Sequence, residues 1–186
     1  MSQFANTTSL LSADYFELFG LPRSFAIDLD RLERDYRALQ SRFHPDRFAS
    51  ASDADRRRSL EISTHINSAY LTLRRSLNRA RYLLTLTSTS PADNNTPMPA
   101  GFLMRQMELR ESMDDARQHR DATALRRIKN RLSEESAAHE ENLSRLLEQA
   151  CDFEGAAECV RMLGFYESLS CDVDRMIEAV EEAHAV

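Results

Sequence analysis

Helix-breaking residues are few and clustered in this sequence, and their distribution limits the possible folds most strongly. The 186 residues include only 4 glycines and 5 prolines, and three of those prolines lie within residues 87–99. The stretches between the clusters are rich in Leu, Ala, Glu and Arg, which favour helices. Small polar residues and prolines neither continue a helix nor build a core. We therefore predict an all-α protein in which a linker at 87–99 separates helical domains at 12–86 and 100–186.

The first domain is predicted to be an antiparallel helical hairpin with short flanking helices. Residues 1–11 are polar and unpatterned, which predicts a disordered lead-in. Short helices are expected at 15–19 and 78–86, and Asp28 and then Asp53 or Asp55 are expected to cap two long ones. Each long helix has one apolar stripe at helical spacing, so the two can pack together. The stripes are Leu29, Leu32, Tyr36, Leu39 and Phe43, and Leu60, Ile66, Ala69, Leu73 and Leu77.

The second domain is predicted to be a three-helix bundle. Its apolar patterns indicate helices at about 100–118, 121–150 and 153–183, and short joints favour antiparallel neighbours. In the first of these helices, one narrow sector should face the core: Phe102, Leu109, Met113 and Ala116. Leu103, Met104 and Met107 fall well away from that sector, and Glu108, Glu111 and Asp115 follow them around the surface. An apolar strip rimmed by carboxylates suggests a protein-binding surface, although the same side chains could instead pack under the first domain or the linker.

A proline-stopped turn, His44-Pro45-Asp46, joins the two long helices of the first domain. Pro45 fixes its own φ and pushes the preceding residue away from helical geometry, so it should end the first helix. Arg34, Arg37, Arg42 and Arg47 lie off the buried stripe and form a basic edge beside the turn. Without its flanks, this pattern favours a helix stop beside a solvated basic face over a binding site.

The flanks of this turn resemble a J domain. The resemblance rests on the segments DYFELFGL (14–21), HPD (44–46) and INSAYLTL (66–73). More narrowly, the segment FLMRQMELRE (102–111) resembles the second module of the HscB family, the J-type co-chaperones of bacterial iron–sulfur cluster assembly. The resemblance covers nearly the whole chain from residue 14.

This resemblance implies the function and the partners. The J domain would bind a DnaK-class ATPase of the HscA type, through His44, Pro45, Asp46 and the basic edge, and stimulate its ATP hydrolysis. The bundle would bind the cluster scaffold IscU through the strip and the carboxylates that rim it. The resemblance also indicates Phe165, because its position matches that of an aromatic residue in the scaffold interface of the family. Phe165 could equally be a core residue. A J-domain co-chaperone for a different client is the alternative.

Charge and composition bear on the remaining classes of function. Residues 12–86 carry 13 Arg against 10 Asp and Glu, and residues 87–186 carry 11 Lys and Arg against 20, which suggests modules with different partners or simply two solvated surfaces. The basic edge could in principle bind nucleic acid, but the excess of acidic residues in the rest of the chain argues against this function. Nothing near His44 and Asp46 supports an acid–base enzyme, because no nucleophile motif or phosphate loop accompanies them.

We expect neither a cofactor nor a metal site. His139 lies on an apolar stripe and is expected to be packed or hydrogen-bonded, since no second residue has ligand spacing. The three cysteines lack any Cys-x-x-Cys pair, are expected to act as small hydrophobic residues, and favour a reducing cytoplasm. No apolar run is long enough to span a membrane.

Overall fold

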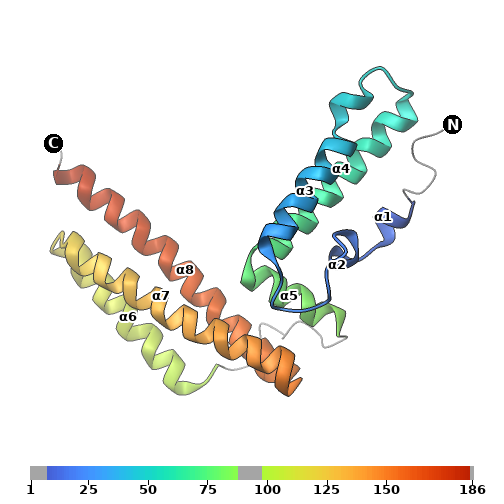
Figure 1. Cartoon of the computed structure of the whole chain (residues 1–186). Coiled ribbons are helices and arrows are strands. Elements are labelled where there is room, and N and C mark those ends of the chain that lie inside the picture. Colours follow the sequence, from blue (N-terminus) through green and yellow to red (C-terminus); the bar gives the residue numbers. More distant parts are fainter. Residues whose placement is uncertain (1–7, 88–97, 185–186) are drawn as a thin grey trace. The chain divides into compact units, whose positions relative to one another are not determined.

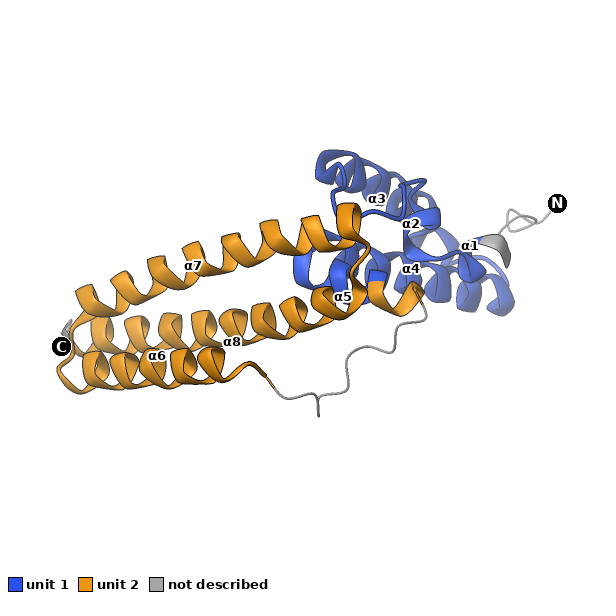
Figure 2. Ribbon diagram, turned by 90° about the horizontal axis from the view of Figure 1, so that it is seen from below, with its two compact units in different colours: residues 1–83 blue, residues 84–186 orange. Residues whose placement is uncertain are grey.

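The structure, a computed structural model, describes residues 8–87 and 98–184, all of whose regular elements are helical. It divides into two compact units, Met1–Leu83 and Leu84–Val186 (Figure 2). This division falls inside a helix, a few residues before the expected domain boundary at 86. Residues 88–97, most of the expected linker, lie outside the described residues, as do residues 1–7. No helix of the described ranges is long and apolar enough to cross a bilayer.

The first unit is built on an antiparallel pair of long helices (Figure 1). Its elements are α1 (Thr8–Ser12), α2 (Tyr15–Leu18), α3 (Leu29–Phe43), the 3-10 turn η1 (Pro45–Phe48), α4 (Asp53–Arg74) and α5 (Ser76–Leu86). Asp28 caps α3 as expected, whereas Ser52 caps α4 in place of Asp53 or Asp55. Leu32 and Phe43 of α3 are buried, as are Ile66 and Leu73 of α4. The predicted hairpin is therefore present.

The predicted stripes are wrong at Leu29 and Leu60, which are exposed, and Leu77 is buried but belongs to α5 rather than to α4. Leu60 is 58% exposed, because it lies about 120° around α4 from the buried Ile66, whereas Ser59 lies on the buried side. Leu29 is 49% exposed, since it occupies the first turn of α3. The expected disordered lead-in does not hold for residues 8–11, which belong to α1: Leu10 and Leu11 are half-buried, and α1 packs against α4.

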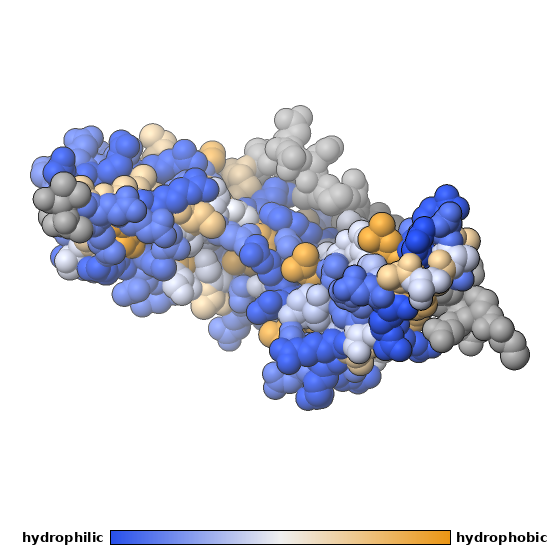
Figure 3. All heavy atoms as spheres, turned by 90° about the horizontal axis from the view of Figure 1, so that it is seen from above, coloured by the Kyte–Doolittle hydropathy of each residue, from blue (hydrophilic) through white to orange (hydrophobic). Residues whose placement is uncertain are grey.

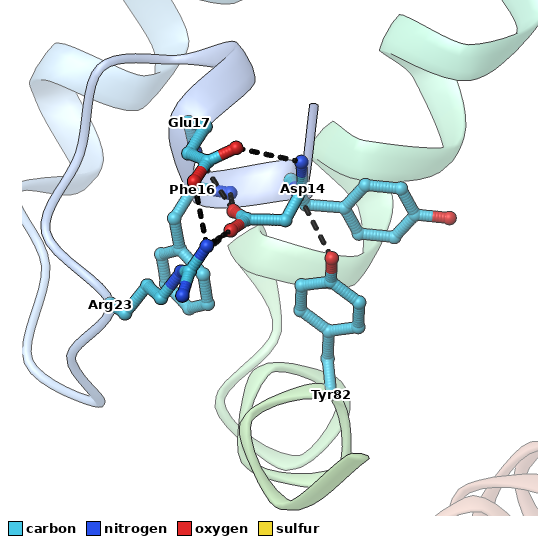
Figure 4. A network of polar contacts seen from close by, with 6 residues as sticks. Asp14, Phe16, Glu17, Arg23 and Tyr82 are labelled. Carbon is cyan, nitrogen blue, oxygen red and sulfur yellow. Dashed lines mark hydrogen bonds and ion pairs between the residues drawn. The ribbon is translucent and has the colours of Figure 1, made fainter. Parts of the chain in front are cut away.

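A network of hydrogen bonds and ion pairs around Asp14 holds α2 in place before the hairpin (Figure 4). The Asp14 carboxylate accepts a hydrogen bond from the Glu17 N–H (2.9 Å), and the Glu17 carboxylate accepts one from the Asp14 N–H (3.3 Å). This reciprocal capping box satisfies two donors that the helix start leaves open. The Arg23 guanidinium binds both carboxylates at 2.6 Å, and the Tyr15 N–H donates to the Tyr82 hydroxyl of α5 at 3.0 Å. The segment before α3 is thus fastened to the last helix of the unit.

The second unit contains a bundle of three long helices, as predicted. They are α6 (Ala100–Gln118), α7 (Ala122–Arg145) and α8 (Phe153–His184), which lie side by side in Figure 1. The core face expected for α6 is confirmed, since Phe102, Leu109, Met113 and Ala116 are all buried. They pack with Leu125 and Leu132 of α7 and with α8 residues such as Val173.

The end of α7 differs from the prediction. A π-helical turn, η2 (Leu146–Ala150), replaces the last α-helical turns, and Cys151 closes it in the left-handed region with φ 51°. Ala150, the last residue of the helix predicted at 121–150, is exposed, because the change of helical period rotates it away from the buried side of α7. The expectation for the cysteines holds only for Cys159, since Cys151 and Cys171 are exposed.

Candidate functional site

The His44-Pro45-Asp46 turn is exposed, and Pro45 and one hydrogen bond restrict its geometry. His44 ends α3 with an extended backbone and Pro45 begins η1, so the turn is both a helix stop and a helix start. His44 Nδ1 accepts a hydrogen bond from the Asp46 N–H at 3.3 Å and lies 3.6 Å from the Asp46 carboxylate. The His44 and Asp46 side chains are 52% and 90% exposed. The turn therefore presents two polar side chains on a rigid backbone.

The four arginines of the predicted basic edge are all exposed. Arg37 pairs with Glu33 at 2.7 Å, and the Arg42 guanidinium lies 5.0 Å from the centre of the Phe43 ring. Arg47 reaches back across the turn and donates to the Ser41 carbonyl at 3.1 Å, whereas Arg34 forms no ion pair within the described parts of the chain. Three of the four guanidiniums are thus positioned by contacts on the hairpin itself.

The Glu33 carboxylate beside this edge is stabilised in its ionised form. Hydrogen bonds from the Tyr70 hydroxyl and then from Arg37 lower the pKa of Glu33 below its ordinary value. The same contact with Glu33 raises the pKa of Tyr70. Tyr70 also stacks on Tyr36, with 3.9 Å between the ring centres, so these contacts join α3 to α4 next to the arginines.

The predicted strip on α6 is exposed. Leu103 is 46%, Met104 65% and Met107 72% exposed, and their spacing of three and four residues places them on one face of the helix. Glu108, Glu111 and Asp115 are exposed further along the same helix. Figure 3 shows a mainly hydrophilic surface on the face that it draws, with apolar residues in small groups. Of the seven large apolar side chains that are exposed in the described ranges, three lie within two turns of α6.

Phe165, the remaining candidate, is half-buried at the border of this surface. Its ring meets the buried Phe102 edge-on at 5.5 Å between ring centres, and the Arg110 guanidinium lies 5.7 Å above it. Phe165 thus belongs partly to the core and partly to the surface. The sequence indicated Phe165 only through the family resemblance, and it did not indicate Arg110.

A second contact that the sequence analysis missed ties the strip to α7. Arg105, between Met104 and Met107, forms ion pairs with Glu135 of α7 and with Glu108, the latter at 3.2 Å. Burial, the largest single effect, opposes ionisation of Glu135, but the hydrogen bonds from Arg105 and Tyr166 and the charges of Arg105 and Arg131 together outweigh it and lower the Glu135 pKa. The spacing from Arg105 to Glu108 could have suggested the local pair. The partner on α7, 30 residues away, carries no such signal.

His139 and Cys159 of the bundle have structural roles. Burial lowers the pKa of His139 and raises that of Cys159 to about 11, and the Cys159 thiol donates to the His139 carbonyl at 3.2 Å. His139 is therefore a packed histidine, as expected. Within the described ranges, no group of three His, Cys, Asp or Glu side chains is placed to hold a metal ion.

The hairpin, its exposed turn and the added bundle define a J-domain co-chaperone. The chain belongs to the HscB co-chaperone family. The family model for the HSCB C-terminal oligomerisation domain matches residues 98–174. The HscB homologues of Azoarcus sp. (strain BH72) and Burkholderia multivorans, both described as co-chaperone proteins, are 42% and 45% identical over 172 residues. These alignments cover 92% of this chain and 97% and 98% of the relatives.

Solved structures support the same assignment. The chaperone HscB from Vibrio cholerae matches with a TM-score of 0.81 and 38% identity, over 90% of this chain and 99% of that one. The human co-chaperone HscB matches with a TM-score of 0.80 and 30% identity, over 88% and 81% of the two chains. The fold of both units is thus the fold of this family.

Proposed function

We propose that this chain couples an HscA-type heat-shock ATPase to an IscU-type iron–sulfur scaffold. The first unit binds the ATPase through His44, Pro45, Asp46 and the arginines Arg34, Arg37, Arg42 and Arg47, and stimulates its ATP hydrolysis. The second unit binds the scaffold through Leu103, Met104 and Met107, with Glu108, Glu111, Asp115 and Phe165 around them, and delivers it to the ATPase.

The exposed, preorganised turn is the observation that carries the first half of the proposal. His44 and Asp46 are largely open to solvent, yet Pro45 and the hydrogen bond between the two residues restrict their geometry. A side chain that is ordered before binding loses less entropy in the complex. The adjacent arginines suit an acidic surface on the ATPase and would act mainly on the rate and orientation of the encounter.

The strip on α6 supports the second half. Three exposed apolar side chains can be buried only against a partner or another part of the chain, and flexible methionine adapts to such contacts. Arg105 pairs with Glu108 and anchors the strip to α7, so the helix can present the strip without rearrangement. Arg110 over Phe165 extends this surface towards α8.

In this proposal the chain is an adaptor with no active site of its own, and it acts in the cytoplasm. The relatives are described as co-chaperones, and the exposed Cys151 and Cys171, which are free thiols, suit a reducing compartment. The proposed function requires neither a cofactor nor nucleic acid. The basic edge would bind carboxylates of the partner protein.

ATP turnover by the cognate HscA-type ATPase tests the first half. We expect the purified chain to accelerate turnover and His44→Ala to abolish the acceleration while its circular dichroism spectrum and melting temperature stay those of the unsubstituted chain. The control is His119→Ala, an exposed histidine of the second unit, which should stimulate normally. Full stimulation by a folded His44→Ala variant would refute the assignment.

The client is tested separately, because the J domain cannot identify it. A J-domain co-chaperone with another client would behave identically in the ATPase assay. Isothermal titration of the full chain with an apo IscU-type scaffold should show saturable binding that is independent of the ATPase. Absence of binding, together with intact stimulation, would favour the alternative client.

A further inference from the structure

A basic hollow lies between the end of α6 and the last turns of α8, on a part of the bundle that the proposed function does not use. Its volume is about 440 Å³. Its rim carries Arg117, Arg120 and Arg175 with one carboxylate, Asp172, and its floor includes the apolar Met176 and Val180. Arg117 lies ten residues after Met107, which is about 15 Å along a helix axis, so the hollow is separate from the strip.

The charge of the hollow is opposite to that of its surroundings. Three guanidiniums and one carboxylate leave the lining with a net charge of +2, whereas residues 87–186 carry 11 basic against 20 acidic side chains. A cluster of like charges is unfavourable in isolation, because its members repel each other. Because the rest of the bundle is acidic, the positive charge of the hollow makes it a place where an anionic group is attracted.

The arginines of the hollow are available to a ligand. Within the part of the chain that the structure describes, Arg117 and Arg175 pair with nearby residues of their own helices, Asp114 at 3.2 Å and Asp172 at 3.4 Å, and both side chains are more than half exposed. Exposed pairs of this kind contribute about 0.2–1 kcal/mol, so an incoming anion can replace them. Arg120, at the left-handed position after α6 with φ 50°, forms no ion pair within the described ranges. A guanidinium binds a carboxylate with two parallel hydrogen bonds.

The shape of the hollow favours a peptide over a free small anion. Small-molecule sites bury most of their ligand, but this rim is made of exposed side chains and cannot enclose one. The aliphatic floor beside the charges requires a ligand that presents an apolar side chain together with its anionic groups. A peptide that alternates carboxylates with leucine or a similar residue has both features.

We propose that this hollow binds an acidic peptide segment of a partner protein, with an aliphatic side chain against Met176 and Val180 and carboxylates on Arg117, Arg120 and Arg175. The site would give the bundle a second protein contact, which is independent of the strip. A free anion and a second copy of this chain are the competing occupants.

The test uses the full chain, labelled with nitrogen-15, and a capped probe peptide, Gly-Glu-Glu-Leu-Leu-Glu-Glu-Gly. We expect saturable shifts of the amide signals around Arg117, Arg175 and Val180, and weaker binding as salt rises from about 0.1 to 1 M, where charges are screened over about 3 Å. The analogue with Gln in place of each Glu should not bind. Equal binding of the two peptides, or shifts elsewhere, would overturn the proposal.

Matched double variants complete the test. Arg120→Gln with Arg175→Gln should weaken probe binding about tenfold, as expected when two exposed charge contacts are lost. Arg127→Gln with Arg145→Gln removes the same charge from α7 and should bind normally. Equal affinities of the two variants would refute the site. So would inorganic phosphate binding there as tightly as the peptide, or sedimentation showing self-association that only the first variant loses.

Discussion

The Ser59 hydroxyl of α4 donates a hydrogen bond to the Phe43 carbonyl of α3, with 3.0 Å between the oxygens. Phe43 is the last residue of α3 and precedes His44 directly. The last carbonyls of a helix lack intrahelical donors. Ser59, which is fully buried, therefore satisfies the end of α3 from the opposite helix and holds the backbone on which the His44-Pro45-Asp46 turn is built.

Replacing Ser59 with Ala should destabilise the first unit. The Phe43 carbonyl would remain buried without its donor, which costs about 1–3 kcal/mol. Urea unfolding followed by circular dichroism measures the loss. Ser68→Ala, at an exposed position of the same helix, is the control and should leave stability nearly unchanged. Indistinguishable midpoints for the two variants would show that the hydrogen bond does not stabilise the hairpin.

Two leucines of the second unit should respond oppositely to the same substitution. Leu125 is fully buried in the bundle, so Leu125→Ala should lower the unfolding free energy by about 2–5 kcal/mol. Leu103→Ala should change it by less than about 0.5 kcal/mol, because Leu103 is already 46% exposed. Thermal unfolding of both variants measures the difference. Comparable losses would mean that Leu103 is covered in the folded chain.

The combined change of Leu103, Met104 and Met107 to Ala should weaken scaffold binding by at least about fivefold, because few residues dominate a typical interface. The melting temperature should not fall. Calorimetry with the IscU-type scaffold makes the measurement. Leu60→Ala with Leu71→Ala removes two similarly exposed leucines from the first unit and should bind normally. Unchanged affinity of the triple variant would remove the strip from the interface.

The Glu135 carboxylate should make the bundle sensitive to acid. Its pKa is lowered in the folded chain, so its contribution to stability is present above the ordinary value of 4.5 and is lost as pH falls through the lowered pKa. Glu135→Gln should cost about 1 kcal/mol at neutral pH.

The cost of this substitution should disappear as the pH falls below 4.5. Urea unfolding at a series of pH values measures it. Glu134→Gln, at the exposed neighbouring position, is the control. A cost for Glu135→Gln that does not change with pH would show that packing, rather than the charge, is lost.

Regular patterns within single helices were predictable from the sequence. The four buried positions of α6 follow from its periodicity alone, and so do its exposed strip and its bounds. The turn at Pro45 follows from the restricted backbone of proline. These features depend only on residues that are three or four positions apart, so the sequence alone is sufficient to predict them.

Deviations had two sources, an imprecise spacing within a helix and a change of helical period. Leu60 was expected in the core, but it lies about 120° around α4 from Ile66, and Ser59 occupies the buried side and donates to the Phe43 carbonyl. At Leu146–Ala150 the backbone hydrogen bonds change from the α-helical to the π-helical pattern, and Ala150 becomes exposed. The spacing of apolar residues does not indicate this change. A single helix pattern does not specify such details.

The sequence alone therefore determined the all-α class, the position of the turn and the helix that carries the strip, because each depends on local propensity and spacing. The tertiary structure decided which helices meet and through which polar groups: Ser59 with Phe43, Arg105 with Glu135, and the three arginines around one hollow. These pairings join residues that are distant in sequence, and folding brings them together only because the apolar faces of their helices pack.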